Sequence, residues 1–293
     1  MIANPSAEHQ EAACAPAVLS GAGELTCRDL RSHQDLESAA ALETEIWGYT
    51  DRLDALPPSL LSASIRVGGL LLGAFDADRL VGFVYSFPAI RNGETIHWSH
   101  RLGVAEAYRS TGVGHWLKLE QRRRVAALGL NLVAWTYDPM LAANAHLNLT
   151  KLRATAARYE TDVYGTSSSP LHAGIPTDRL VVDWRIGGAT GEPDADRSRR
   201  RHTAICDAPV VNRTRRGRVW PACAALELSC PSDTVRVEIP LGFTQMLRRD
   251  RGLALQWRLA TRAVFTTYFG AGFTAVDFAV CRDRGLGWYL LTR

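Results

Sequence analysis

The hydrophobic residues of this chain follow two different spacings from about residue 24 onward. Short apolar clusters predict strands, and apolar residues three or four positions apart over longer stretches predict helices. Strands are predicted at 24–30, 68–77, 79–90, 94–104 and 130–137. Helices are predicted at 33–48, 58–66, 112–129 and about 141–158. This alternation of strands and helices is typical of an α/β fold.

The second half of the chain divides at a change of composition. Two further strands are predicted at 160–165 and 178–185, before a stretch rich in Gly, Pro, Asp and Arg at 187–217. That stretch is typical of a linker or an exposed insertion. A strand at 234–240, a helix at about 245–268 and two strand-like runs follow it. We therefore expect a mobile tail at 1–23, a domain at 24–186, a linker at 187–217 and a small α+β extension at 218–293 packed on that domain.

The stretch most informative about chemistry joins the predicted strand 94–104 to the predicted helix 112–129. Its connection reads Arg109-Ser110-Thr111-Gly112-Val113-Gly114. Glycines allow close approach of the backbone to a ligand, and the first N–H groups of a helix lack intrahelical acceptors. The helix dipole and the Arg109 guanidinium both favour an anion there. The spacing suits a pyrophosphate, although a glycine-rich helix start packed tightly on a sheet would look the same.

The order of elements resembles that of the GNAT acyltransferase superfamily over about residues 25–185. The family's acyl-CoA loop, Gln/Arg-x-x-Gly-x-Gly/Ala, is matched by Arg109, Gly112 and Gly114. The segments SHRLGV, TYDP and NAHLNLTKL are similar to a branch of predicted N-acyltransferases that carry a C-terminal extension. The resemblance implies a mixed sheet with flanking helices, an acyl-CoA co-substrate such as acetyl-CoA, and a primary amine of a small molecule, such as an amino acid, as acceptor.

The resemblance also implies which residues would hold the co-substrate. Backbone groups of Leu102, Gly103 and Val104 would pair with the pantetheine arm, where the strand at 94–104 diverges from the next one. Amides from Ser110 to Gly114 would hold the pyrophosphate. Asn144 would bond the pantetheine amides, although it could equally be a turn residue or a helix cap. The amine would then attack the thioester directly, with one group accepting its proton and another protonating the thiolate.

For the proton acceptor, the predicted strand at 94–104 offers two histidines. Strict alternation puts His97, Ser99 and Arg101 on one face of the strand. Trp98, His100 and Leu102 then lie on the other face. We expect His100 to be the base, because it is nearer the divergence and its ordinary pKa of ~6.5 suits proton transfer at neutral pH. His97 is the reserve candidate, and a structural role for either histidine stays open.

The proton donor is where the sequence departs from the family. Aligning Lys151-Leu152-Arg153 with the family's Lys-Leu-Gly turn places Leu149 where many members carry a tyrosine. Tyr137 is our first replacement candidate, with Tyr159 and Tyr164 as others; a bound water, or a thiolate that leaves unprotonated, is equally open. Arg153 in place of Gly implies that the preceding helix ends differently. The missing tyrosine supports an alternative function, a catalytically silent acyl-CoA-binding sensor or interaction module.

Composition narrows the remaining possibilities. The 293 residues are 46% hydrophobic and 22% charged, which excludes a disordered chain or a coiled coil. No apolar run approaches the ~18 residues of a membrane-spanning helix. Six cysteines without a CxxC motif predict reduced thiols, no metal site and a cytoplasmic location.

One segment, 197–218, holds eight arginines and one acid, a local charge of +7, so the rest of the chain carries −3 of the net charge of +4. The arginines of this segment could neutralise nucleic-acid phosphates, but no aromatic residues are interleaved with them. We therefore expect a solvated loop and no nucleic-acid partner. The helix at 245–268 would cover the acceptor side of the first domain or form a homodimer surface.

Overall fold

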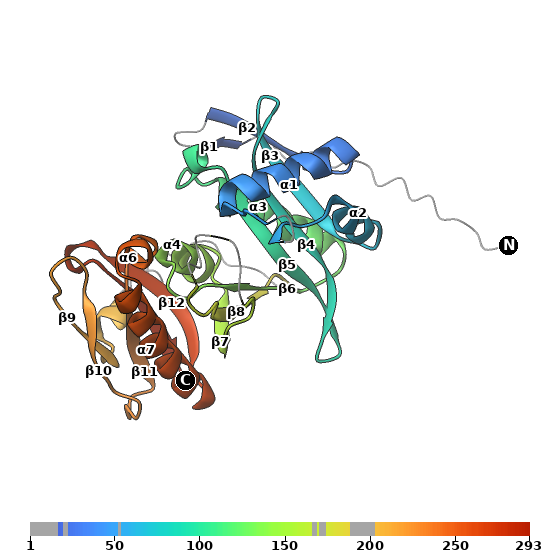
Figure 1. The fold of residues 1–293 in the computed structure, drawn as a ribbon. Helices are drawn as coiled ribbons and strands as arrows, with labels where there is room; N and C mark the ends of the chain where they lie inside the picture. Colours follow the sequence, from blue (N-terminus) through green and yellow to red (C-terminus); the bar gives the residue numbers. More distant parts are fainter. Residues whose placement is uncertain (1–16, 20–22, 52–53, 166–168, 170–173, 188–202) are drawn as a thin grey trace. The chain divides into compact units, whose positions relative to one another are not determined.

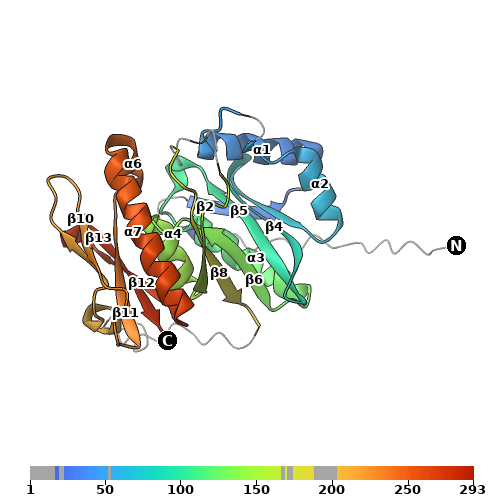
Figure 2. The same cartoon turned by 60° about the horizontal axis from the view of Figure 1, so that its bottom comes forward.

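The computed structural model describes residues 17–19, 23–51, 54–165, 169, 174–187 and 203–293. These residues form two compact units. Unit 1 comprises the described residues of Met1–Ile46, Ala55–Pro88 and Ser99–Arg124, and unit 2 comprises those of Trp47–Asp54, Ala89–Trp98 and Val125–Arg293. Strands β4 (Arg79–Arg91) and β5 (Glu94–Val104) each contribute residues to both. Figures 1 and 2 show the elements of both units.

Unit 1 is built on an antiparallel meander. Its strands are β1 (Ala17–Leu19), β2 (Gly23–Asp29), β3 (Leu70–Asp76), most of β4 and the last part of β5, in that order across the sheet. The strands predicted at 68–77 and 79–90 are confirmed as β3 and β4, which form a hairpin in which Asp76 pairs with Arg79 across a two-residue turn. The predicted helices are confirmed as α1 (His33–Trp47), α2 (Pro58–Arg66) and α3 (Val113–Ala127). Pro58 begins α2, where its missing N–H costs nothing.

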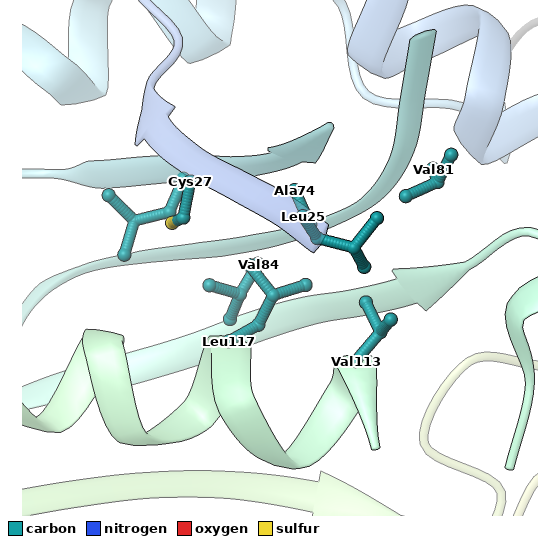
Figure 3. Packing of buried hydrophobic residues seen from close by; sticks show 8 residues of the cluster. Leu25, Cys27, Ala74, Val81, Val84, Val113 and Leu117 are labelled. Carbon is teal, nitrogen blue, oxygen red and sulfur yellow. The ribbon is translucent and has the colours of Figure 1, made fainter. Parts of the chain in front are cut away.

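Helix α3 packs on this sheet through a cluster of buried aliphatic side chains (Figure 3). Val113 and Leu117 of the helix meet Leu25 of β2 and Val84 of β4. The close approach depends on Gly82 of β4, because a Cβ there would lie 3.1 Å from both the Gly103 oxygen and Val113 Cγ1. The packing therefore fixes the start of α3 against β4 and β5.

Unit 2 contains a mixed sheet. The first part of β5 pairs in parallel with β6 (Leu132–Tyr137), and β8 (Arg179–Arg185), β7 (Thr155–Glu160), β12 (Thr274–Cys281), β13 (Leu286–Thr292) and β11 (Thr234–Pro240) follow in that order, all antiparallel. A separate ribbon pairs β9 (Asn212–Arg215) with β10 (Ala222–Leu226). The remaining helical elements are α4 (Ala142–Ala145), the π-helix η3 (His146–Lys151), α6 (Phe243–Arg249) and α7 (Arg251–Gly270), with 3-10 turns η2 (Glu106–Tyr108) and η4 (Arg282–Arg284). The α/β class with a mixed sheet and flanking helices is confirmed.

Two predicted elements between residues 141 and 165 are wrong. The helix expected at 141–158 ends at Lys151, and a strand begins at Thr155 instead of Glu160. The alanine-rich stretch after Arg153 favours helix by local propensity, but pairing with β8 on one side and β12 on the other overrides it. Arg153 itself has φ 56°, so it takes the left-handed conformation that the family's glycine would supply.

The predicted C-terminal helix is interrupted. Asp250 separates α6 from α7 and accepts a hydrogen bond from Leu253 N at 3.0 Å, capping the second helix. Of the predicted linker, 188–202 lie outside the described residues, whereas Asn212–Arg215 form β9. The predicted tail also lies largely outside them, and Ala17–Leu19 pair with β2. The four-part division of the chain stays a prediction.

Candidate functional site

The connection between β5 and α3 in unit 1 has an unusual backbone. Ser110 has φ 65° and Gly112 has φ 104°, so two residues two positions apart lie in left-handed or glycine-favoured regions. Backbones of this kind turn successive N–H groups toward one side and form a concave anion-binding surface. For a non-glycine residue such as Ser110, this conformation costs on the order of 1 kcal/mol of free energy. The loop is therefore held in a strained, preorganised shape.

The N–H groups of this loop have no acceptor in the described chain. Those of Ser110 through Gly114 donate no hydrogen bond to any described residue, and the first helical bond runs from Trp116 N to the Gly112 oxygen at 3.0 Å. Five successive donors thus lie at the N-terminus of a 15-residue helix, where the dipole also favours negative charge. The arrangement can bind an anion with several oxygens.

Neighbouring side chains hold the loop in place. Tyr108 Oη donates to Asp76 Oδ2 at 2.5 Å, and Thr111 Oγ1 donates to the Tyr108 oxygen at 2.7 Å. Exposed Arg109 donates from Nε to the Val104 oxygen at 3.3 Å. The structure thus brings together Leu102, Gly103, Val104 and the loop residues.

Glycine at position 114 is not required by the fold. Gly112 needs to be glycine for its φ, but a Cβ at Gly114 would lie 3.6 Å from Val104 Cγ2 and 3.8 Å from Leu102 Cδ2. Both are ordinary contact distances. Tight packing of the helix start on the sheet therefore does not explain the second glycine of the motif.

The side chains of β5 do not alternate as predicted. Ser99 accepts hydrogen bonds from Lys118 and Gln121 of α3, at 3.1 Å each, and Leu102 also packs against α3. His100 and Arg101, between them, both face the other side of the sheet. There His100 lies 6.2 Å from the Tyr85 ring, and Arg101 bonds to α1. Two consecutive side chains on one face are the mark of a β-bulge, a feature common beside active sites.

His100 lies in a half-buried aromatic setting. Its ring contacts those of Tyr85 and Phe87 at 6.2 and 6.1 Å, and Tyr85 Oη donates to Ser64 Oγ of α2 at 2.8 Å. Burial, together with the charge of Arg101, lowers the pKa of His100 to about 4. The imidazole is therefore neutral at physiological pH and a weaker base than a histidine with the ordinary pKa of ~6.5.

The two predicted histidines differ in access. His97 is fully buried, in unit 2, where it pairs in register with Val133. The parallel ladder between β5 and β6 consists of this pair and Trp98 with Ala134. His100 follows two residues after the ladder and is partly exposed. Of the two, His100 is placed where a substrate could reach it.

Two polar groups that sequence reasoning missed support the bulge from opposite faces. Lys118 is buried on α3, donates to Gln121 Oε1 at 2.7 Å as well as to Ser99, and burial lowers its pKa well below the ordinary value. On the other face, buried Glu43 of α1 accepts from Arg101 Nε at 2.8 Å and from Leu56 N at 3.1 Å. The helical periodicity of both segments places Glu43 and Lys118 at positions of the apolar face. A charged residue at such a position is the sequence signal that could have identified these two groups.

In unit 2 the predicted proton donors have different surroundings. Tyr137 is buried, and this burial raises the pKa of its phenol, with the Asp138 carboxylate adding to the effect. Tyr159 donates to Asp178 Oδ2 at 2.7 Å, and burial first and Asp178 second raise its pKa. Tyr164 is exposed and lies 3.1 Å from Thr136 Oγ1. Leu149 is fully buried in η3. Asn144 is an interior residue of α4, whose cap is Leu141, so the helix-cap alternative for Asn144 is excluded.

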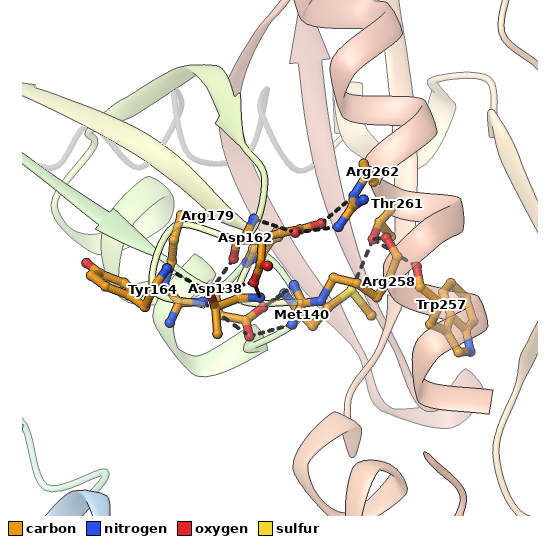
Figure 4. A network of polar contacts seen from close by, with 12 residues as sticks. Asp138, Met140, Asp162, Tyr164, Arg179, Trp257, Arg258, Thr261 and Arg262 are labelled. Atoms are coloured by element: carbon orange, nitrogen blue, oxygen red, sulfur yellow. Dashed lines mark hydrogen bonds and ion pairs between the residues drawn. The ribbon is translucent and has the colours of Figure 1, made fainter. Parts of the chain in front are cut away.

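A buried ionic network joins the ends of β6 and β8 to α7 (Figure 4). Arg258 donates to both oxygens of Asp138 at 2.7 and 2.6 Å, and Arg262 donates to both oxygens of Asp178 at 2.8 and 2.7 Å. Arg179 lies 3.8 Å from Asp138 and over the ring of Tyr164. Burial raises the pKa of Asp138, but the Arg258 and Arg179 charges outweigh it, and the net shift is downward.

Three further observations bear on ligands and location. Among the described residues, no three His, Cys, Asp or Glu side chains gather as a metal site. No described helix has the length and apolar character needed to cross a membrane. The described cysteines are free thiols.

The sequence matches no protein-family model and no curated protein. The structure has partial matches among solved acetyltransferases. The ribosomal-protein-S18-alanine N-acetyltransferase of Escherichia coli is 14% identical, with a TM-score of 0.45 over 58% of this chain and 99% of its own. Arabidopsis thaliana NAA60 with acetyl-CoA is 17% identical, with a TM-score of 0.45 over 56% of this chain and 99% of its own. The aminoglycoside 6'-acetyltransferase type Ii is 18% identical, with a TM-score of 0.43 over 56% and 97%.

Proposed function

We propose that this protein is an acyl-CoA-dependent N-acyltransferase that moves an acetyl or other short acyl group to a primary amine of a small molecule. The observation that carries the proposal is the row of five N–H groups without acceptors in the described chain, Ser110 to Gly114, at the start of α3. A pyrophosphate presents several anionic oxygens and fits such a row better than a single carboxylate does. The exposed Arg109 guanidinium adds a charge beside it.

The remaining parts of the co-substrate would follow from the direction of β5. We propose that backbone groups of Leu102, Gly103 and Val104 pair with the pantetheine arm, and that Asn144 bonds its amides. The short β5–β6 ladder supports this placement, since β5 continues for six residues beyond Trp98, the last of its residues that pairs with β6. No metal enters the proposed reaction.

In the proposed reaction the neutral amine attacks the thioester carbonyl. A C–N bond forms, the C–S bond breaks, and the proton lost by the amine replaces the acyl group on the CoA sulfur. His100, neutral at physiological pH, is the proposed proton acceptor. Tyr137 is the proposed donor to the thiolate, although burial and the Asp138 carboxylate raise its pKa and make the phenol a weaker acid than an ordinary tyrosine. The cycle closes when the Tyr137 phenolate takes up a proton and His100 releases the one it accepted from the amine. The sequence resemblance supports an amino acid as acceptor.

Binding is tested by isothermal titration of the full chain with acetyl-CoA and succinyl-CoA, with Arg109→Ala as the site variant. Arg122→Ala, on the same helix but outside the loop, is a matched control. We expect binding to the parent and the control and a loss of about 1–2 kcal/mol, or about tenfold, in Arg109→Ala. Absence of binding at millimolar co-substrate would refute the proposal.

Catalysis is tested separately by thiol release with a panel of primary amines. A transferase releases CoA thiol only when an amine is present, whereas a silent sensor binds acyl-CoA and releases none. Tyr137→Phe distinguishes the Tyr137 phenol from a water molecule as the group that protonates the thiolate. Its thiol release falls if the phenol donates, and stays unchanged if water protonates the thiolate.

A further inference from the structure

Unit 2 contains the same strand–helix–strand–strand arrangement twice. Copy A, residues 132–185, comprises β6, α4 with η3, β7 and β8. Copy B, residues 234–292, comprises β11, α6 with α7, β12 and β13. The strands of copy A lie in the order β6–β8–β7, and those of copy B in the order β11–β13–β12, with every neighbouring pair antiparallel. The sheet order is therefore palindromic about the junction of β7 and β12.

The local details of the two copies also correspond. The helical segment of each ends at a left-handed residue, Arg153 with φ 56° and Gly272 with φ 87°. Each next strand begins two residues later with Thr-Ala, and each shows a register irregularity directly after that alanine. These coincidences make Ala156 of copy A the counterpart of Ala275 of copy B.

Ala156 and Ala275 pair with each other across the antiparallel junction. Equivalent residues face one another only where a two-fold axis passes between them, as in the interface of a symmetric dimer. The chain therefore contains a local two-fold axis between β7 and β12.

Packing across the junction follows the same symmetry. Seven positions before the left-handed residue lie His146 in copy A and Phe265 in copy B. Phe265 stacks on Tyr159 of copy A, with ring centroids 5.8 Å apart, and His146 lies against the backbone of Phe278, the counterpart of Tyr159. The helical segment of each copy thus packs on the junction strand of the other copy, α7 on β7 and η3 on β12, as helices do across the interface of two subunits.

The two copies differ in the length of their helices and at the outer edge of copy B. Helix α7 has 20 residues, so copy B extends further than copy A and delivers Arg258 and Arg262 to Asp138 and Asp178. On the outer edge of copy B, the side-chain amide of Asn212 pairs with the backbone of Glu238 in β11. The Asn212 amide nitrogen donates to the Glu238 carbonyl oxygen, and its amide oxygen accepts from Glu238 N, both at 2.7 Å. The backbone groups of Arg236 and Glu238 on that edge are thus paired within the chain.

We propose that copy B is a built-in second subunit, which occupies the edge of β7 as the partner of a symmetric dimer would. An uncovered β7 would present unpaired N–H and C=O groups to any other chain. Because copy B fills that edge, the protein works as a monomer at this surface. The homodimer surface considered for the helix at 245–268 is then satisfied internally, by α7 packing on β7.

The test is an isotope-mixing cross-link. Ala156→Cys/Ala275→Cys is prepared with ¹⁴N and with ¹⁵N, and the two samples are mixed unfolded and refolded together in a glutathione redox buffer. Paired Cα atoms of an antiparallel ladder lie within the range that a disulfide spans. Peptides joined through positions 156 and 275 are then analysed by mass spectrometry, which separates this link from any formed by native cysteines.

We expect linked peptides that are all-¹⁴N or all-¹⁵N, as an intramolecular bond requires. Peptides of mixed isotope would show that β7 pairs with another copy and would overturn the proposal. Absence of the link would also overturn it, because the two alanines would then not be neighbours. Ala156→Cys/Ala279→Cys is the matched control: Ala279 lies further along β12, opposite Trp288 of β13, and should yield no such link.

Discussion

Glu43 and Arg101 form an ion pair in which the carboxylate is almost completely enclosed. The Arg101 Nε to Glu43 Oε1 distance is 2.8 Å, and the side chains are 16% and 1% exposed. The pair joins α1 to the bulge of β5, and the second carboxylate oxygen accepts from the Leu56 amide. One side chain thus ties two segments of unit 1 to the strand that carries His100.

Glu43→Ala should lower the free energy of unfolding by about 3–5 kcal/mol, because it removes the buried carboxylate that pairs with Arg101 and accepts from the Leu56 amide. Urea denaturation measures the change. The exposed pair Arg123–Glu120 provides the control, and Arg123→Ala should cost under about 1 kcal/mol. Equal losses in the two variants would contradict the structural role of Glu43.

Gly112→Ala should weaken acyl-CoA binding about tenfold or more, because a side chain strains the φ of 104° and distorts the row of amides. Gly93→Ala is matched in backbone strain, with φ 79° and open space around its Cβ, but lies outside the loop. Both should lose on the order of 1 kcal/mol of stability. Only Gly112→Ala should lose affinity by calorimetry; a similar loss in Gly93→Ala would argue against the loop.

The unfolding of the protein should depend on pH through His100. Its pKa is about 4 when folded and ~6.5 when unfolded, so between these values the unfolded chain binds more protons. Stability from this group is complete above pH 6.5 and falls as the pH drops toward 4, by at most about 3 kcal/mol. His100→Gln should show a shallower fall in denaturation series from pH 7 to 4.5. Identical slopes would contradict a lowered pKa.

The same lowered pKa makes a kinetic prediction. The pH profile of kcat/KM should show no inflection near 6.5 from this imidazole, since it is already neutral there. A profile that falls below pH 6.5 in the parent but not in His100→Gln would show an ordinary histidine instead.

Arg258→Met should destabilise the protein by about 3–5 kcal/mol, because Asp138 stays buried without its bidentate partner. Arg258→Met/Asp138→Leu removes both charges and should recover most of that loss. Thermal and urea unfolding measure both variants. If the double variant is as unstable as the single one, the ion pair is not the source of the effect.

Local sequence patterns were sufficient where local chemistry decides the structure. The hairpin turn after Asp76, the proline that begins α2 and Gly112 of the 110–114 loop each have one strong structural requirement. They were insufficient where partners distant in sequence decide. β7 is a strand because β8 and β12 flank it, against the helical propensity of its alanines.

The candidate site follows the same division. The row of loop amides follows from the motif itself, whereas the bulge at His100 and Arg101 depends on Glu43 and Lys118, which lie in other elements. The low pKa of His100 depends on aromatic rings of β4. An alternation rule carries no information about any of these partners.

The left-handed conformation of Arg153 lowers the stability of the folded protein, and a substitution could remove part of that cost. The equivalent residue of copy B is already glycine, which adopts this conformation without steric cost, whereas arginine pays about 1 kcal/mol. Arg153→Gly would recover that cost, less what the freer unfolded chain gains. Because the freer unfolded chain offsets about 0.4–1 kcal/mol of that gain, the net stabilisation is at most about 0.6 kcal/mol, which would compensate only small destabilising changes at the proposed acyl-transfer site.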